Sequence, residues 1–267
     1  MQRLYVNPRF REPLARVDLE SFEQFVARAD QGELVAEDKG RSTHRLTLDG
    51  QTYYLKTVHK PIVAPMVEAL LALRKPHHYC WREKLQVDAL QAHGIDVMEV
   101  AAAGESSSRG ILDFSFLLAP EVSGAFLDQI YVAAGPQQQR ALLEQLGALV
   151  GQLHSGGFFA PVRMKDIVVK DDGRFVMIDR ETRKPGPRRF SRHHALQGLG
   201  RTLARQQRDG VHWEEEELAA HLRAYRTAVG AKLGLNESEL EQKVHESTRK
   251  ALSLIHISEP TRPNAPS

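Results

Sequence analysis

The sequence contains a single cysteine, Cys80, among its 267 residues. One thiol excludes an internal disulfide framework and a zinc site built from several thiolates. Because Cys80 falls in an apolar helical pattern, we expect it to pack in the core. The sequence also lacks any run of about 18 apolar residues, and its start, MQRLYVNPRFREP, lacks the apolar core of a secretory signal. It therefore predicts no transmembrane helix, and a cytoplasmic location is the default.

Acidic residues are missing from one long stretch, although the whole chain is nearly balanced at 36 Lys and Arg against 34 Asp and Glu. Between Thr182 and Arg208 every charged side chain is basic: Arg183, Lys184, Arg188, Arg189, Arg192, Arg201, Arg205 and Arg208, with His193 and His194 beside them. Such a tract suits a sugar acid, a phosphate-bearing glycolipid or an anionic membrane surface. An ordinary solvated face is the alternative. Few aromatic residues are interleaved, so we expect no nucleic-acid partner.

The first part of the chain reads as strands followed by helices. Short apolar runs near residues 34–37, 44–48 and 52–58 are separated by Lys-Gly-Arg and Asp-Gly, which favour hairpins. The segments PIVAPMVEALLALRK and CWREKLQVDALQAHG have helical spacing, with Gly94 as the expected C-terminal cap. Strand character returns in IDVMEVAAAG and GILDFSFLLAP. We expect residues 1–119 to form a β-rich lobe.

The chain then becomes mainly helical, and we expect residues 120–251 to form a second lobe. PQQQRALLEQLGALVGQLHSGG predicts a long buried helix ended by two glycines, and Glu214–Glu217 suit the start of a later helix. Between them, IVV and RFVMI predict two short strands around Lys-Asp-Asp-Gly. The final residues, 252–267, include LSLIHISEPTRP, which resembles the translation of a sequencing-library adapter. We expect this tail to be non-native and the natural C-terminus to be missing; a short natural tail is the alternative.

Lys56 and Glu83 each interrupt an apolar surface. Lys56 lies in YYLKTV on the same strand face as Tyr54 and Val58, and Glu83 falls in the helical row of Cys80, Val87 and Leu90. A charged group among apolar neighbours needs a partner of opposite charge or a phosphate. Pairing Lys56 with Glu83 would satisfy both residues, whereas the commoner alternative is that each reaches solvent past the edge of its lobe.

Two acids flank the predicted hairpin. Asp166 precedes IVV and Asp179 follows FVMI, so the hairpin would place both carboxylates at the same end. Adjacent carboxylates repel one another unless a cation lies between them. Mg²⁺ that bridges phosphate oxygens suits such a pair, because it takes oxygen ligands and only one or two from the protein. Two exposed acids at turns are the alternative.

This order of residues resembles the protein-kinase-like fold, an α+β fold with a β-rich N-lobe and a mainly helical C-lobe. The closer resemblance is to the bacterial lipopolysaccharide kinases, which phosphorylate heptose or Kdo sugars of the inner core. It is carried by YYLKTVHK, ALLALRKP, WREKLQVDALQAHGIDVMEVAAAG, SFLLAPEVSG, LHSGGFF and MIDRETRKP, over roughly residues 30–210. Each motif is loose, but their order and spacing are specific.

The resemblance implies a role for each of these positions. Lys56 would bind the α and β phosphates of ATP and pair with Glu83, while Asp179 and Asp166 would hold Mg²⁺. Gly40, in EDKGRST, is the candidate for the loop that covers the phosphates, although most such glycines simply make turns. The implied partner is the lipopolysaccharide core or a related anionic glycolipid, reached from the cytoplasm with a peripheral contact at the inner membrane.

The sequence departs from the family where the catalytic base should lie. In kinases an aspartate orients the acceptor hydroxyl and takes its proton, but the two possible registers place Pro161 or Val162 there. Asp166 could serve directly, or transfer could proceed slowly by positioning alone. A degenerate kinase-like protein that binds nucleotide or glycolipid as a scaffold or regulator is the rival. A small-molecule phosphotransferase of the aminoglycoside or choline kinase type ranks last, because that group keeps a His-x-Asp motif.

Overall fold

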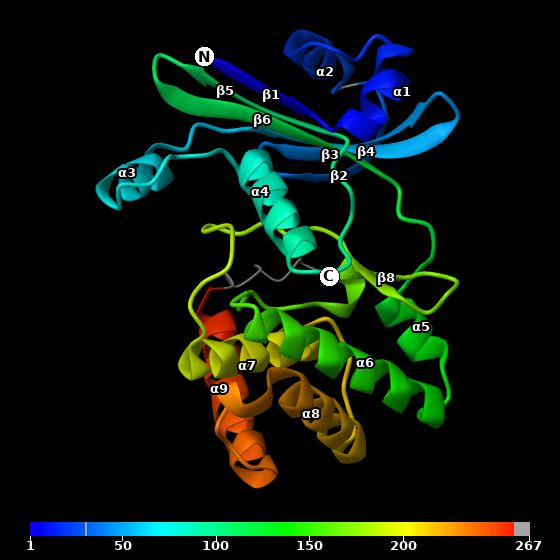
Figure 1. Cartoon of the computed structure of the whole chain (residues 1–267), viewed down its shortest axis with the longest axis vertical. Helices are drawn as coiled ribbons and strands as arrows, with labels where there is room; N and C mark the ends of the chain where they lie inside the picture. Colours follow the sequence, from blue (N-terminus) through cyan, green and yellow to red (C-terminus); the bar gives the residue numbers. More distant parts are fainter. Residues whose placement is uncertain (30, 259–267) are drawn as a thin grey trace, which may run out of the picture. The chain divides into compact units, whose positions relative to one another are not determined.

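The computed structural model describes residues 1–29 and 31–258, with side chains as far as Ser253 (Figure 1). The described chain forms two compact units. The first, here called the sheet unit, contains Met1–Gly124 and Lys170–Gly186; the second, the helical unit, contains Ala125–Val169 and the chain from Pro187 onward. The segment that carries Asp179 thus folds with the sheet unit.

The sheet unit is built on six antiparallel strands in the order β1-β5-β6-β4-β3-β2. Their bounds are β1 Gln2–Val6, β2 Glu33–Asp38, β3 Arg41–Leu48, β4 Gln51–His59, β5 Ala102–Ser108 and β6 Ile111–Pro120. The three strands predicted between residues 34 and 58 are confirmed. Lys39-Gly40 and Asp49-Gly50 make the two hairpin turns with positive φ at both positions, the geometry that suits the right-handed twist of strands.

Two parts of this unit differ from the sequence-based expectation. IDVMEV does not form a strand: β5 begins only at Ala102, and Val97 makes an isolated parallel bridge to Met177. The N-terminal residues, for which no element was predicted, form the edge strand β1, the short 3₁₀ helix Pro8–Phe10 and the helices α1 (Arg11–Ala15) and α2 (Phe22–Arg28). These helices cover one face of the sheet and bury Leu14 and Phe25 against it (Figure 1).

Helix α4, Tyr79–Ala92, packs on the opposite face of the sheet (Figure 1). It buries the row Cys80, Glu83, Val87 and Leu90 as the apolar spacing predicts, each side chain at most 1% exposed. Burial raises the pKa of the Cys80 thiol to about 12, so this cysteine is an inert core residue. Gly94 follows the end of α4 with φ of +70°, the left-handed conformation expected of a helix-ending glycine. The preceding helix, α3, spans Val63–Leu71.

The helical unit contains α5 (Leu127–Ala133), α6 (Pro136–Ser155), α7 (Arg192–Arg208), α8 (Glu215–Val229) and α9 (Glu237–Ser258). Short strands β7 (Ala125–Phe126) and β8 (Ile167–Val169) pair antiparallel within it. The predicted helix ending at Gly156-Gly157 and the predicted acidic helix start are confirmed as α6 and α8, the latter with a capping box between Glu214 and Glu217. No helix among residues 1–29 and 31–258 is long and apolar enough to span a membrane.

The C-terminal helix extends into the tail that we expect to be non-native. Helix α9 runs to Ser258, and so includes the first residues of the segment 252–267. Residues 259–267 lie outside the described part of the chain.

Candidate functional site

Lys56 lies on the central strand β4, where hydrogen bonds to β3 and β6 fix its backbone opposite Thr43 and Leu117. Its side chain is 25% exposed, and its Nζ lies 2.8 Å from Oε2 and 3.1 Å from Oε1 of Glu83. Nζ also lies 2.7 Å from Oδ1 of Asp179. Burial, the largest effect, opposes the charge on Lys56, but the two carboxylates together raise its pKa above the ordinary lysine value. The lysine is therefore firmly charged.

Glu83 is the buried member of this group, with a side chain only 1% exposed. Its position on α4 is set by the apolar neighbours of its row, which pack against the sheet. Burial raises the pKa of its carboxyl, and the nearby Lys56 counteracts this effect. Because the carboxylate is buried, its pairing with lysine is what makes the charged form tolerable. The pairing predicted from the two interrupted apolar surfaces is present.

Asp179 follows the short strand β9, Phe175–Met177. This strand is held by two backbone hydrogen bonds, from Met177 N–H to Asp96 O at 3.0 Å and from Met98 N–H to Met177 O at 2.8 Å. Asp179 has φ of +51°, which is uncommon for a residue other than glycine. Such local strain persists only where the surrounding structure holds it, and it is concentrated at functional sites.

The donor set of this group fits a metal only in part. Asp179 is 60% exposed, so its carboxylate is accessible to an ion. Among the described residues, no group of three or more His, Cys, Asp and Glu side chains is placed to hold a metal. Mg²⁺ commonly takes one or two protein carboxylates and completes its shell with water and phosphate oxygens. The residues present therefore suit Mg²⁺ that arrives with a nucleotide.

A second charged group anchors the segment after Asp179, and we did not predict it from the sequence. Glu181 accepts from Arg41 Nη1 at 2.7 Å and lies 3.9 Å from Arg82 Nη2. The guanidinium groups of Arg41 and Arg82 both lie against the ring of Tyr79, at 4.3 and 4.6 Å from its centroid. These residues come from β3, α4 and the segment after β9. No single spacing pattern marks the group, because Arg41, the α4 residues and Glu181 lie in three different parts of the chain.

Gly40 occupies the second position of the β2–β3 turn, with φ of +80°. Its carbonyl accepts from His59 N–H at 2.8 Å, and a Cβ at this position would contact the carbonyl of His59. The turn geometry alone therefore explains the glycine. Whether this turn also covers nucleotide phosphates stays a prediction.

Asp166 lies in the helical unit, at the end of the short 3₁₀ helix Met164–Asp166. Its negative charge acts on the guanidinium of Arg205, although burial is the larger effect and lowers the pKa of that arginine. Asp166 and Asp179 belong to different units. Their joint role as a magnesium clamp stays a prediction.

The segment Pro161-Val162-Arg163 is firmly anchored within the helical unit. Val162 is fully buried, and its backbone N–H donates to Thr202 Oγ1 at 3.0 Å. Arg163 makes a two-bond ion pair with Asp209, at 2.9 and 3.0 Å. At the position where a catalytic aspartate is expected, the chain therefore carries residues that are held by packing and hydrogen bonds within the helical unit.

Comparison with known proteins places these residues in a family. The chain matches the model of the lipopolysaccharide kinase (Kdo/WaaP) family over residues 26–225. It is 30% identical over 134 residues to the lipopolysaccharide core heptose(I) kinase WaaP of Pseudomonas aeruginosa, a match that covers 48% of this chain. The match covers 50% of the relative, so the chain spans about half the length of this curated protein.

The fold is also that of a solved structure. A structure described as WaaP in complex with acyl carrier protein superposes with a TM-score of 0.63 at 20% identity, and the match covers 93% of this chain and 99% of that chain. This confirms the predicted α+β, protein-kinase-like fold. The family model covers more than half of the chain and includes Lys56, Glu83, Asp166 and Asp179. The chain therefore belongs to the lipopolysaccharide kinase (Kdo/WaaP) family.

Proposed function

We propose that this protein is an ATP-dependent phosphotransferase that acts on a hydroxyl of a lipopolysaccharide inner-core sugar, either heptose or Kdo. The observation that carries the proposal is the position of Lys56, whose Nζ lies 2.8 Å from Glu83 and 2.7 Å from Asp179. A fixed, charged lysine beside an accessible carboxylate can neutralise the phosphates of a nucleotide. Family membership supports the class of acceptor.

Each residue has a distinct part in this proposal. Lys56 contacts oxygens of the α and β phosphates, and Glu83 holds the lysine in place. Asp179 and Asp166 would bind Mg²⁺, which would neutralise further charge on the phosphate oxygens. The acceptor oxygen bonds to the γ phosphorus while the bond to the β–γ bridging oxygen breaks, and ADP leaves. The hydroxyl proton passes to a base, for which Asp166 is our candidate.

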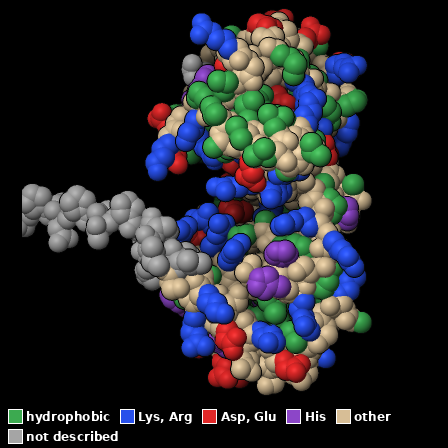
Figure 2. All heavy atoms as spheres, turned by 90° about the vertical axis from the view of Figure 1, so that its left-hand side faces the viewer, with side chains coloured by type: hydrophobic (Ala, Val, Ile, Leu, Met, Phe, Trp, Pro, Cys, Tyr) green, Lys and Arg blue, Asp and Glu red, His purple; other side chains and the backbone are tan. Residues whose placement is uncertain are grey.

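The basic tract supports an anionic acceptor. All eight of its Lys and Arg side chains are exposed, and four of them lie on α7. On the face that Figure 2 shows, many Lys and Arg side chains lie at the surface of the helical unit. Exposed cations of this kind attract phosphate or carboxylate groups on a glycolipid and the anionic surface of a membrane. We therefore propose that the protein acts on the cytoplasmic side of the inner membrane, in peripheral contact with it.

The rival function is a nucleotide- or glycolipid-binding scaffold without transfer activity. One observation favours it: the place of the expected catalytic aspartate is taken by Pro161 and by the fully buried Val162. Loss of a general base costs about 10² to 10⁴ in rate. The Lys56 group would then bind nucleotide without efficient transfer.

Radiolabelled ATP separates the two functions. With Mg²⁺ and isolated lipopolysaccharide core, the enzyme should transfer the γ-phosphate label to sugar, and Asp179→Asn should abolish transfer. The matched control is Asp171→Asn, because Asp171 is an exposed acid in the turn before β9. A thermal shift with ATP but no label on any core acceptor would support the scaffold. If ATP causes no thermal shift and no label appears on any core acceptor, the kinase and the nucleotide-binding scaffold are both contradicted.

A further inference from the structure

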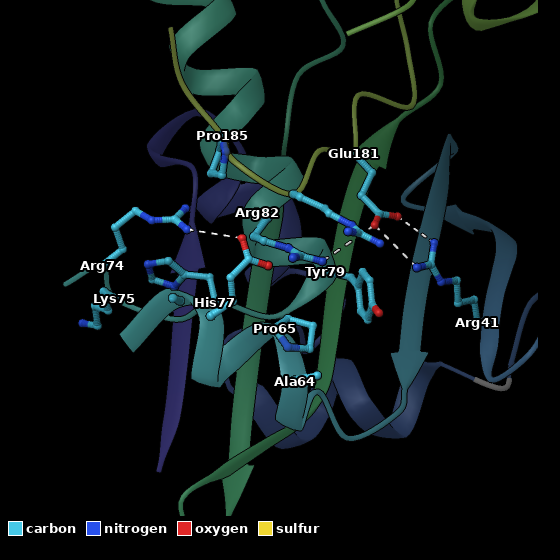
Figure 3. A pocket seen from close by; sticks show the side chains of 13 residues that line it. Arg41, Ala64, Pro65, Arg74, Lys75, His77, Tyr79, Arg82, Glu181 and Pro185 are labelled. Atoms are coloured by element: carbon cyan, nitrogen blue, oxygen red, sulfur yellow. Dashed lines mark hydrogen bonds and ion pairs between the residues drawn. The ribbon is translucent and has the colours of Figure 1, made fainter. Parts of the chain in front are cut away.

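A cavity of about 500 Å³ lies within the sheet unit, apart from the Lys56 group. It is bounded by α3, the residues that lead into α4, the first turn of α4, the start of β3 and the segment after Asp179 (Figure 3). Neither Lys56, Glu83 nor Asp179 lines it. Five Lys and Arg side chains do: Arg41, Arg74, Lys75, Arg82 and Arg183. The cavity is therefore strongly cationic.

Arg82 is the residue that points to a ligand. Its side chain is only 8% exposed, and its Nε has no hydrogen-bond partner among the described residues. A buried guanidinium whose N–H is unpaired carries a desolvation cost that an anion would remove. Figure 3 shows the Arg82 side chain extending along the cavity toward Glu181. The first turn of α4, which carries Arg82, adds the positive end of a helix dipole.

The acids in the cavity do not balance these cations. Among the residues that the structure describes, the acids that line the cavity beside the five basic residues are Glu68 and Glu181. Glu181 is bonded to Arg41 at 2.7 Å and is 3.9 Å from Arg82, so one carboxylate serves two guanidinium groups. Glu68 is 56% exposed, and its Oε1 lies 3.8 Å from Arg74 Nη2. Such an exposed ion pair at this distance is weak. Positive charge therefore remains for an added anion.

We propose that this cavity binds a phosphate monoester group. A dianionic phosphate can accept the Arg82 N–H together with donors from Arg74 and Lys75, and guanidinium groups match phosphate oxygens in geometry. The cavity is much larger than one phosphate, so the group enters as part of a larger molecule. Two sources carry this chemistry: a soluble phosphorylated sugar and a lipid headgroup.

Helix α3 is the reason for testing the lipid source. Besides lining the cavity with Ala64, Pro65, Glu68 and Ala69, this helix and the residue two positions after its end expose apolar side chains: Val63, Val67, Leu70, Leu71 and Leu73, each at least 50% exposed. Figure 2 shows apolar side chains gathered on this face of the sheet unit. A lipid headgroup in the cavity would bring such side chains near acyl chains.

Calorimetric titration of the full chain with inorganic phosphate and with glycerol 3-phosphate tests the site. Arg82→Gln should weaken binding about tenfold, as expected for the loss of a charge-assisted hydrogen bond. Because Arg82 is buried and this variant could fail to fold, Arg74→Gln/Lys75→Gln tests the same cavity at exposed positions and should weaken binding similarly. The control Arg11→Gln/Arg109→Gln removes the same charge from exposed residues outside the cavity and should change nothing.

Vesicle sedimentation shows whether the phosphate group belongs to a lipid headgroup or to a soluble phosphorylated sugar. Binding to phosphatidylcholine vesicles that requires added phosphatidic acid, and that is lost in Arg74→Gln/Lys75→Gln, would support the lipid headgroup. Phosphate binding with the expected variant effects but no vesicle binding would support the soluble source. The proposal is overturned if neither phosphate nor vesicles bind, or if the cavity variants bind as the wild type does. It is also overturned if Lys56→Met alone abolishes phosphate binding, because the anion would then occupy the nucleotide site.

Discussion

The Nζ of Lys56 lies 2.8 Å from a carboxylate oxygen of Glu83 whose side chain is only 1% exposed. Removing one partner of a buried ion pair leaves an uncompensated charge. Because Lys56 itself is partly exposed, we expect Lys56→Met to lower the free energy of unfolding by about 3 kcal/mol, the low end of the range for such pairs. The double variant Lys56→Met/Glu83→Leu should recover most of this loss. Urea unfolding in a Trp213→Phe background, where Trp81 on α4 reports on the sheet unit, measures both.

The electrostatic cause of the stability loss in Lys56→Met can be checked by its pH dependence. Without the lysine, burial raises the pKa of Glu83 further, so the folded state favours the protonated carboxyl. A folded-state pKa above the unfolded value penalises folding at high pH, and the penalty shrinks as pH falls through the folded pKa. Relative to wild type, the loss should therefore be smaller at pH 5 than at pH 8. An equal loss at both would show that packing, not charge, is responsible.

Asp166 should be required for transfer even though it lies in the helical unit. If it acts as base or metal ligand, Asp166→Asn should lower kcat roughly hundredfold. A ligand role predicts that half-saturation by Mg²⁺ also rises by about tenfold, whereas a base role predicts that the acidic limb of the pH–rate profile disappears. Asp171→Asn should leave all three quantities unchanged. Full activity in Asp166→Asn, with normal Mg²⁺ dependence, would contradict the assignment.

Glu181 should act as a positioning residue for Asp179. Its carboxylate holds Arg41 at 2.7 Å and lies near Arg82, and it anchors the chain two residues after the strained Asp179. Glu181→Gln removes this shared charge, so we expect kcat to fall and half-saturation by Mg²⁺ to rise, each by about tenfold. Glu181→Asp should restore part of both effects. A purely structural role would lower thermal stability and leave Mg²⁺ dependence unchanged.

The sequence predicts those parts of the fold whose pattern is local. Alternation and Asp-Gly turns identify β3 and β4, and helical spacing identifies α4 and α6. Strand β1 escapes prediction because it is an edge strand of five residues whose character comes from its pairing with β5. IDVMEV has the composition of a strand, yet only Val97 forms a bridge there, so tertiary context overrides propensity.

The same distinction applies to the site. Lys56 and Glu83 are visible in the sequence because each breaks an apolar pattern that burial imposes. Arg41, Arg82 and Glu181 break no such pattern, and only the three-dimensional fold brings them together around Tyr79. Gly40 illustrates the reverse case, since a glycine proposed for phosphate binding is already explained by its turn.

Gly147 should be essential to the contact between α6 and α8. A Cβ added there would collide with the backbone carbonyl of His221 on α8, and backbone cannot move aside cheaply. We expect Gly147→Ala to lower the free energy of unfolding of the helical unit by roughly 1–3 kcal/mol, as overpacking does. Gly156→Ala, whose added methyl would have no neighbour nearer than 3.4 Å, is the control. Equal stability of the two variants, measured by urea unfolding, would contradict this close approach.

His221 should make the helical unit sensitive to mild acid. It is fully buried, its Nδ1 lies 3.1 Å from Leu143 O, and burial lowers its pKa from 6.5 to about 4. A folded-state pKa below the unfolded value gives stability that is complete above the unfolded pKa and is lost as pH falls. Between pH 6.5 and about 4, the free energy of unfolding should therefore fall by about 3 kcal/mol in total. Urea unfolding in a Trp81→Phe background reports on this unit, because the ring of the remaining Trp213 lies 4.8 Å from the His221 ring, measured between centroids. His221→Phe should flatten the pH dependence, while His245→Gln, at an exposed position, should not. An unchanged slope in His221→Phe would assign the acid sensitivity to other groups.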